Sequence, residues 1–160
     1  MKRLAAIAII AAAALSFPKT EARVIEDIVE PIPVVACEKE ERFTQGEVDL
    51  LAALVMAEAG NQDKAGKRLV VDVVLNRIAS PSFPNTLHEV VYQPYQFTPT
   101  ANGMLFHYPT TQECYEAVYE ELERQTDTEI VFFNTGGFPS YGRPAYKYGA
   151  HYFSYLKGGN

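Results

Sequence analysis

One stretch of the chain constrains the fold most, because its side chains are apolar on every side of a helix. From Leu50 to Ala59 every residue is apolar except Glu58. The preceding segment TQGE (44–47) has capping-box spacing, and Gly60 is well placed to end a helix. We therefore predict a helix from Thr44 to Ala59. Helices that are apolar all round are normally buried on all sides, so this helix should lie at the centre of the core.

Glu58 is the candidate catalytic residue because it is the one carboxylate within that apolar run. Helical spacing places it between Leu51 and Leu54 rather than on a charged face. Lost hydration raises the pKa of a carboxyl group, and the negative end of the helix dipole raises it further. A carboxyl group that stays protonated near neutral pH is what cleavage of a glycosidic bond requires of its general acid. The alternative is a solvated glutamate at a frayed helix end.

Three more helices are expected along the chain. Residues 63–78 predict a second helix, although their valine run also fits a buried strand. The segment TLHE (86–89) repeats the capping spacing before a short helix that ends near Tyr92. Residues 93–109 should form a loop because prolines and a glycine interrupt them. A third long helix is predicted from Thr110 or Thr111 to about Gln125.

Near the end of the domain the sequence predicts strands rather than helices. Ile130–Phe133 and His151–Tyr155 have the composition of two short strands, and a glycine- and proline-rich connection joins them. The expected class is therefore α+β: a single domain dominated by helices, with a small late β-hairpin or sheet.

The first 22 residues have the pattern of a secretory signal peptide. Lys2 and Arg3 precede an apolar run at 4–15, which is shorter than the roughly 20 residues of a membrane span. The residues TEA (20–22) supply a small-residue cleavage pattern, so cleavage after Ala22 is expected. We predict export to the cell envelope, the periplasm or the extracellular space. The alternative is an uncleaved anchor.

The rest of the chain divides into two parts. Residues 23–43 lack periodicity and should form an extended arm or linker, and residues 44–160 should form the folded catalytic domain. The arm contains Cys37 and the third long helix contains Cys114. In an oxidising compartment a disulfide between them would close a long loop, worth about 4–5 kcal/mol in the chain-entropy model. Two unpaired thiols, one of them buried, are the alternative.

Charge and motif content argue against several function classes. The chain has 14 basic and 20 acidic residues and a net charge of −6, which is unfavourable for a nucleic-acid binder. His88, His107 and His151 are scattered, and no HExxH or CxxC pattern occurs, so we predict no metal and no cofactor. No GxSxG turn and no phosphate-binding loop are present.

Aromatic residues concentrate in the second half of the chain. All 10 tyrosines lie at Tyr92 or beyond, many in segments that are predicted to be loops. Flat rings with a polar group suit the apolar faces and hydroxyl rims of sugars, and they equally suit protein interfaces or core packing. Composition alone leaves both roles open.

Five segments, ordered along the chain, carry a family resemblance. They are MAEAGNQ (56–62), VVLNRI (73–78), SFPNTLHEVVYQPYQFTPTANG (82–103), FFN (132–134) and GAHYF (149–153). Together they resemble the SleB-type cell-wall hydrolases, which include the spore cortex-lytic enzymes. The resemblance covers roughly residues 48–155. It implies a lysozyme-like architecture and cleavage of peptidoglycan between N-acetylmuramic acid and N-acetylglucosamine, which several members perform as lytic transglycosylases.

The resemblance also implies site residues. The catalytic glutamate of the family corresponds to Glu58, the residue that its helix already singles out. His151 is expected to line the glycan groove or orient a neighbour, with a core histidine as the alternative. Residues 134–148 depart from the family, which continues after FxN with proline and a later tryptophan, so no contacts are predicted there. The other expected cleft residues are Gln93, Gln96, Phe97 and Asn102, with Tyr92 and Tyr95 as walls.

A single strong carboxylate favours one type of reaction. Glycoside hydrolases usually pair two carboxylates across the scissile bond, and none of Asp63, Asp72 and Glu89 has a matching setting. With one acid, the C6 hydroxyl of the sugar can attack the anomeric carbon, so lytic transglycosylation is preferred. Hydrolysis by water and a non-catalytic glycan-binding envelope module are the alternatives. The expected partners of this chain, taken as a monomer, are peptidoglycan glycan strands and an unidentified envelope component.

Overall fold

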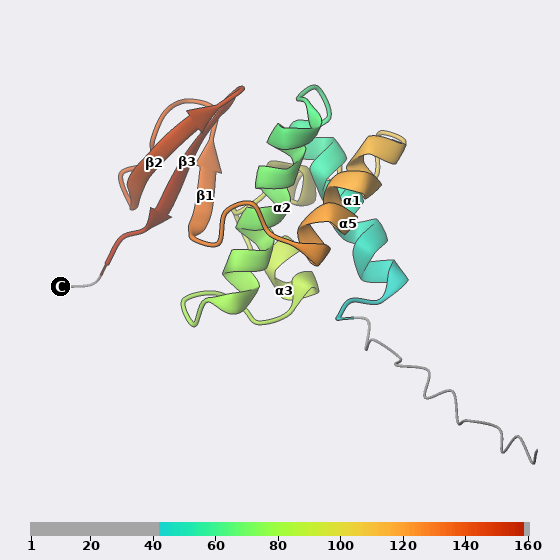
Figure 1. The fold of residues 1–160 in the computed structure, drawn as a ribbon, viewed down its shortest axis with the longest axis horizontal. Coiled ribbons are helices and arrows are strands. Elements are labelled where there is room, and N and C mark those ends of the chain that lie inside the picture. Colours follow the sequence, from blue (N-terminus) through green and yellow to red (C-terminus); the bar gives the residue numbers. More distant parts are fainter. Residues whose placement is uncertain (1–41, 159–160) are drawn as a thin grey trace, which may run out of the picture. The chain divides into compact units, whose positions relative to one another are not determined.

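The computed structural model describes residues 42–158, which form a helical layer and a small sheet (Figure 1). The predicted signal peptide, Cys37 and most of the arm lie outside these residues. Within 42–158 no helix is long and apolar enough to cross a membrane. In chain order the elements are α1 (Gln45–Ala59), α2 (Lys64–Ala79), α3 (Leu87–Val91), α4 (Thr98–Ala101), α5 (Gln112–Glu123), β1 (Ile130–Asn134), β2 (Gly142–Tyr148) and β3 (His151–Leu156).

The first helix forms as predicted. Thr44 caps it: the Glu47 amide donates to the threonine oxygen, and the Glu47 carboxylate accepts from the Thr44 amide at 2.8 Å. Leu54 and Val55 are fully buried, so α1 is a core helix. The helix ends at Ala59, and a side chain at Gly60 would overlap the Met56 carbonyl oxygen, so a glycine fits this tight exit.

The valine-rich segment 69–75 is helical, and the alternative of a buried strand is wrong. Asp63 caps α2 by accepting from the Gly66 amide at 2.9 Å. The helix packs against α1, α3 and α5 and also against β1 (Figure 1). Because neighbours cover it on both sides, it can be apolar over most of its circumference.

Two of the other helices match the prediction and one does not. Thr86 caps α3, with its oxygen accepting from the Glu89 amide. The long helix α5 starts after Thr111 and ends at Glu123, two residues before the expected end. Within 93–109, where we expected only loop, Thr98–Ala101 forms α4. Its proline occupies the first turn, where the missing N–H costs no hydrogen bond, so proline was misleading as a loop signal.

The sheet has three strands rather than two. Both pairings are antiparallel and the order is β1-β3-β2, so β3 is central. The glycine- and proline-rich segment that we expected to be a connection contains β2. This strand tolerates Pro144 because it lies at the sheet edge and its register shifts between Pro144 and Tyr146.

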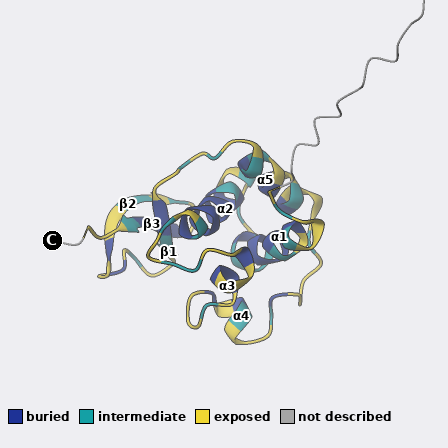
Figure 2. Cartoon of the chain, turned by 90° about the horizontal axis from the view of Figure 1, so that it is seen from below, coloured by how far each residue is buried: buried dark blue, intermediate teal, exposed yellow. Residues whose placement is uncertain are grey.

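The interior has two apolar clusters. Figure 2 shows buried residues both on the helices and on the sheet. The larger one lies among the helices, and the smaller one joins Leu69 and Val73 of α2 to Ile130 and Phe153 of the sheet. Polar groups of α2 also fix the start of β1. Asn76 donates to the Ile130 carbonyl oxygen at 2.8 Å.

Two buried carboxyl groups meet where α2, α5 and the segment before β1 come together. Asp72 is fully buried and Glu121 is 1% exposed. Arg68 and the Thr126 amide donate to Glu121, and the Asp127 amide donates to Asp72 at 2.8 Å. Burial, together with a hydrogen bond to Glu121, raises the pKa of Asp72 to about 8.

This raised pKa makes stability depend on pH. A carboxyl group that binds its proton more tightly in the folded state stabilises the fold at low pH, and this contribution is lost as pH rises from about 4 to about 8. Asp72→Asn cannot ionise, so we expect its unfolding free energy to fall less with pH than that of the wild type. Urea unfolding at about pH 5 and about pH 8.5 measures this difference. Equal pH slopes for the two proteins would contradict it.

Candidate active site

Glu58 lies in the last turn of α1, and its side chain is half-buried. Its Oε1 is buried and has no hydrogen-bond partner within residues 42–158. Burial raises the pKa of Glu58 from 4.5 to about 7. The direction agrees with the expectation from the sequence. Such a group is partly protonated at neutral pH and can first donate and then accept a proton.

The segment between α3 and α4 carries most of the predicted cleft residues, and α1 packs against both of these helices (Figure 2). Tyr92 is 43% exposed, and Gln96 and Asn102 are also exposed. Gln93 is half-buried, and its Oε1 is buried without a partner among the described residues. The segment therefore offers aromatic and amide groups to a ligand beside α1.

Tyr95 adopts a backbone conformation that is unusual for its residue type. Its φ is 64°, in the left-handed region, and its side chain is 96% exposed. A non-glycine residue in this region is strained, and such strain is frequently associated with functional sites. Because the ring is almost fully exposed, packing does not explain why a tyrosine stands here.

Phe97 and His151 lie inside the domain. Phe97 is 1% exposed, and the Arg77 guanidinium lies 5.0 Å from its ring centroid. Its ring points into the domain from the α3–α4 segment and does not reach the surface. His151 is 2% exposed, with Nδ1 2.9 Å from Gln62 Nε2 and its ring 4.6 Å from that of Phe133. This places it to orient a neighbour.

The three candidate second acids are occupied elsewhere. Asp63 caps α2 and accepts from the Tyr148 hydroxyl at 3.0 Å. Glu89 accepts from the Thr86 hydroxyl at 2.7 Å, and Asp72 is buried beside Glu121. None of these three acids is therefore set up as the partner carboxylate of Glu58.

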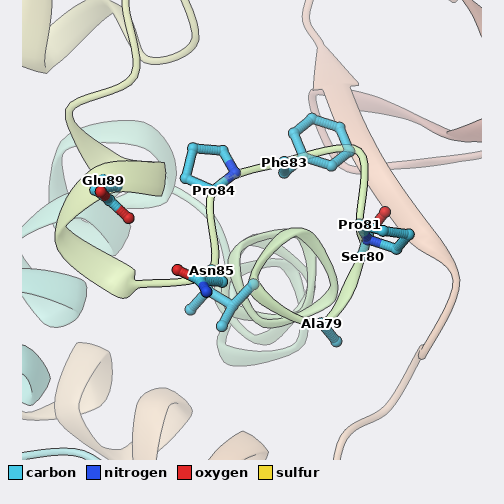
Figure 3. Close-up of a pocket in the computed structure, with 8 residues that line it drawn as sticks. Ala79, Ser80, Pro81, Phe83, Pro84, Asn85 and Glu89 are labelled. Atoms are coloured by element: carbon cyan, nitrogen blue, oxygen red, sulfur yellow. The ribbon is translucent and has the colours of Figure 1, made fainter.

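Two hollows lie near the other end of α2. One, of about 520 Å³, is framed by residues 78–81, residues 83–85 and Glu89 (Figure 3). The other, of about 400 Å³, lies between the end of α2 and the sheet, next to Arg143 and Tyr155. Glu58 lies shortly before the start of α2, whereas both hollows lie at its end. Because α2 has 16 residues, its two ends are about 24 Å apart. The hollows are therefore not the surroundings of Glu58.

Two further predictions concern metals and cysteines. Among the described residues no group of three or more histidine, cysteine or acidic side chains could hold a metal ion. Cys114 is fully buried, with its Sγ 3.2 Å from Thr111 Oγ1. Cys37 lies outside the described residues, so the disulfide stays a prediction.

The residues that hold the turn after Glu58 were not predicted from the sequence. Gln62, Lys67 and Tyr148 all hold this turn. The one available signal was that Gln62 belongs to the MAEAGNQ segment. Nothing in the sequence indicated that it would meet His151, which lies 89 residues away.

The fold and the site define a member of a known family. Residues 61–154 match the family model described as Cell Wall Hydrolase, so the chain belongs to the cell wall hydrolase family. The resemblance described from the sequence is thereby confirmed. Glu58 lies three residues before the matched stretch.

Among curated proteins, the spore cortex-lytic enzyme of Bacillus subtilis is 32% identical over 117 residues, which cover 69% of this chain and 38% of that enzyme. The spore cortex-lytic enzyme of Bacillus cereus is 31% identical over 94 residues, covering 58% of this chain and 36% of that enzyme. The chain thus matches well under half the length of these relatives.

Two solved structures share the fold. The catalytic domain of the Bacillus cereus SleB protein matches with a TM-score of 0.63 and 24% identity, covering 70% of this chain and 91% of that chain. The catalytic domain of the germination-specific lytic transglycosylase SleB from Bacillus anthracis also gives 0.63 and 24%, covering 70% and 96%. The helix-dominated α+β class is confirmed.

The raised pKa of Glu58 predicts a stability cost at neutral pH. Ionising a buried carboxyl group destabilises the folded state as pH rises from the unfolded pKa towards the folded one. We expect Glu58→Gln to be more stable than the wild type above pH 7, by up to about 2–3 kcal/mol, and the difference to vanish near pH 4.

Urea unfolding across this pH range measures the difference. The gain should add to that of Asp72→Asn, because the two carboxyls lie on different helices and neither is a cause of the other's pKa shift. A constant difference between Glu58→Gln and the wild type at all pH values would show that Glu58 titrates as it does in the unfolded chain.

Proposed function

We propose that this domain cleaves peptidoglycan glycan strands between N-acetylmuramic acid and N-acetylglucosamine, with Glu58 as the general acid and base. The observation that carries the proposal is the half-buried Glu58 carboxyl group, whose Oε1 is buried without a partner among the described residues and whose pKa is raised by burial to about 7. Family membership supports the substrate class. The neighbouring segment of exposed tyrosines and amides supplies groups that suit a sugar chain.

The reaction we favour is lytic transglycosylation. Glu58 donates its proton to the glycosidic oxygen, and the bond from that oxygen to the anomeric carbon of the muramic residue breaks. The C6 hydroxyl of the same residue attacks the anomeric carbon, and the Glu58 carboxylate takes the hydroxyl proton. The products are a 1,6-anhydro end and a free hydroxyl end, and Glu58 regains its proton.

The engagement of all three candidate second acids in other contacts supports this route over hydrolysis. A hydrolase usually needs a second carboxylate to activate water or to act as nucleophile. Asp63, Asp72 and Glu89 each make other hydrogen bonds. An internal hydroxyl nucleophile needs only the base that Glu58 becomes after it has donated its proton.

We further propose that the protein acts outside the cytoplasm, because the first 22 residues have the pattern of a signal peptide. Its substrate, the glycan strand of the wall, lies in the same compartment.

Purified peptidoglycan sacculi test the catalytic role. We expect the wild type to release soluble muropeptides and Glu58→Gln to be slower by at least about 10²–10³-fold, because a glutamine cannot transfer the proton. Glu89→Gln is the matched control and should keep activity within about threefold, since the Glu89 carboxylate only accepts from Thr86, the residue that caps a short helix. Binding of sacculi without release by the wild type would indicate the non-catalytic module instead.

Mass spectrometry of the released fragments then separates the two reactions. Anhydro ends are lighter than hydrated ends by one water molecule. Anhydro ends support transglycosylation, and hydrated reducing ends would show that water is the nucleophile.

The strained Tyr95 gives an independent prediction. Tyr95→Gly relieves the left-handed strain and loses no buried contact, so the unfolding free energy should rise by roughly 0.5–1 kcal/mol. Loss of the ring should weaken binding to soluble glycan fragments roughly fivefold, the equivalent of about 1 kcal/mol of sugar stacking. Tyr95→Phe, which keeps the ring, should bind like the wild type. Unchanged binding by Tyr95→Gly would remove this residue from the site.

A further inference from the structure

The turn that joins α1 to α2, residues 60–63, begins two residues after Glu58 and is closed by its own backbone. The backbone N–H of Gln62 donates to the Ala59 carbonyl oxygen at 2.9 Å. The Gln62 carbonyl oxygen accepts from the Lys67 ammonium, which also contacts Glu113 Oε2 on α5 at 2.6 Å. Lys67 is only 2% exposed. The backbone of the turn is thus fastened to α2 and, through Lys67, to α5.

The sheet holds the same turn through side chains. Gln62 Nε2 lies 2.9 Å from Nδ1 of His151 on β3. Burial lowers the pKa of His151, so the ring is neutral at neutral pH and Nδ1 can accept this hydrogen bond. One residue further along the turn, the Asp63 carboxylate accepts from the hydroxyl of Tyr148 on β2.

The side-chain amide group of Gln62 also lies in a space that two glycines leave free. Gly149, in the β2–β3 connection, has a φ of 53°, and a side chain there would collide with Gln62 Oε1. A side chain at Gly66, in the first turn of α2, would meet the same oxygen at 2.8 Å. The hairpin can therefore approach the turn closely enough for His151 to reach Gln62.

We propose that Gln62 and His151 are positioning residues, whose hydrogen bond holds the turn after Glu58 closed and thereby keeps the Glu58 carboxyl group in its buried position. Glu58 is the second-last residue of α1, where helix ends fray unless neighbouring groups hold them. Release of the turn would admit water to the carboxyl group and lower its pKa. The kinetic part of this inference rests on the proposed function.

A matched pair of variants isolates the hydrogen bond. His151→Asn and His151→Leu both lose the imidazole ring and its contact with Phe133. The asparagine oxygen can still accept from Gln62 Nε2 near the position of Nδ1, and leucine cannot. Gln62→Met removes the same hydrogen bond from the other side without changing the length of the side chain.

The first readout needs no activity. Glu58→Gln is combined with each variant. Urea unfolding at about pH 8 then measures how much Glu58→Gln stabilises each variant, compared with how much it stabilises the wild type. We expect His151→Leu and Gln62→Met to reduce this gain to less than about half of its wild-type size, because Glu58 is then solvated. His151→Asn should retain most of it.

The second readout is kinetic and uses soluble glycan fragments. His151→Leu and Gln62→Met should lower kcat about tenfold with KM within about twofold, since the acid is misplaced but the glycan contacts remain. Tyr146→Phe removes a hydrogen bond of 2.9 Å to Asp127 elsewhere in the sheet and should leave kcat and the Glu58→Gln gain unchanged.

The outcomes separate the two claims. A full stability gain and normal kcat in both His151→Leu and Gln62→Met overturn the positioning role. Equal losses in His151→Asn and His151→Leu also overturn it, because packing would then be the cause. If the wild type releases no muropeptides but the stability gain still depends on the hydrogen bond, positioning stands and the proposed function fails.

Discussion

The partial burial of the Glu58 carboxyl group is the constraint on which the site depends. It arises because α1 is enclosed by other elements, with Leu54 and Val55 fully buried and Glu58 in the following turn. A carboxylate in such surroundings loses hydration and, among residues 42–158, gains no hydrogen bond at Oε1, so its neutral form is favoured. The chemistry proposed here therefore derives from the packing of the helix rather than from a neighbouring charge.

This arrangement explains why the small sheet matters to a site on a helix. Among the described residues, the sheet packs against α2, and its hairpin reaches the turn after Glu58 through His151 and Tyr148. The charged residues near this turn have hydrogen-bonding roles of their own: Asp63 caps α2, and Lys67 binds the Gln62 carbonyl oxygen. Neither is a cause of the pKa shift at Glu58, which burial alone explains.

Much of the helical framework could be predicted from the sequence, because its signals are local. The caps at Thr44, Asp63 and Thr86 depend on residues three positions apart, and the apolar run of α1 singles out Glu58 without knowledge of its neighbours. The strand β2 could not be predicted from Gly142 and Pro144, because an edge strand with an irregular register accepts residues that normally interrupt strands.

The candidate site was only partly predictable, because its remaining contacts join residues far apart in the chain. Phe97 lies in a segment of exposed polar and aromatic residues, and its burial under Arg77 follows from tertiary packing. The pairing of Gln62 with His151 depends on how the hairpin docks, and the strain at Tyr95 appears only in its backbone angle. Residue type and spacing do not encode these features.

Site-specific titration of the Glu58 carboxyl carbon by NMR tests the central claim most directly. The account predicts a midpoint near 7 in the folded wild-type protein. A midpoint near 4.5, the ordinary value for a solvated glutamate, would contradict it.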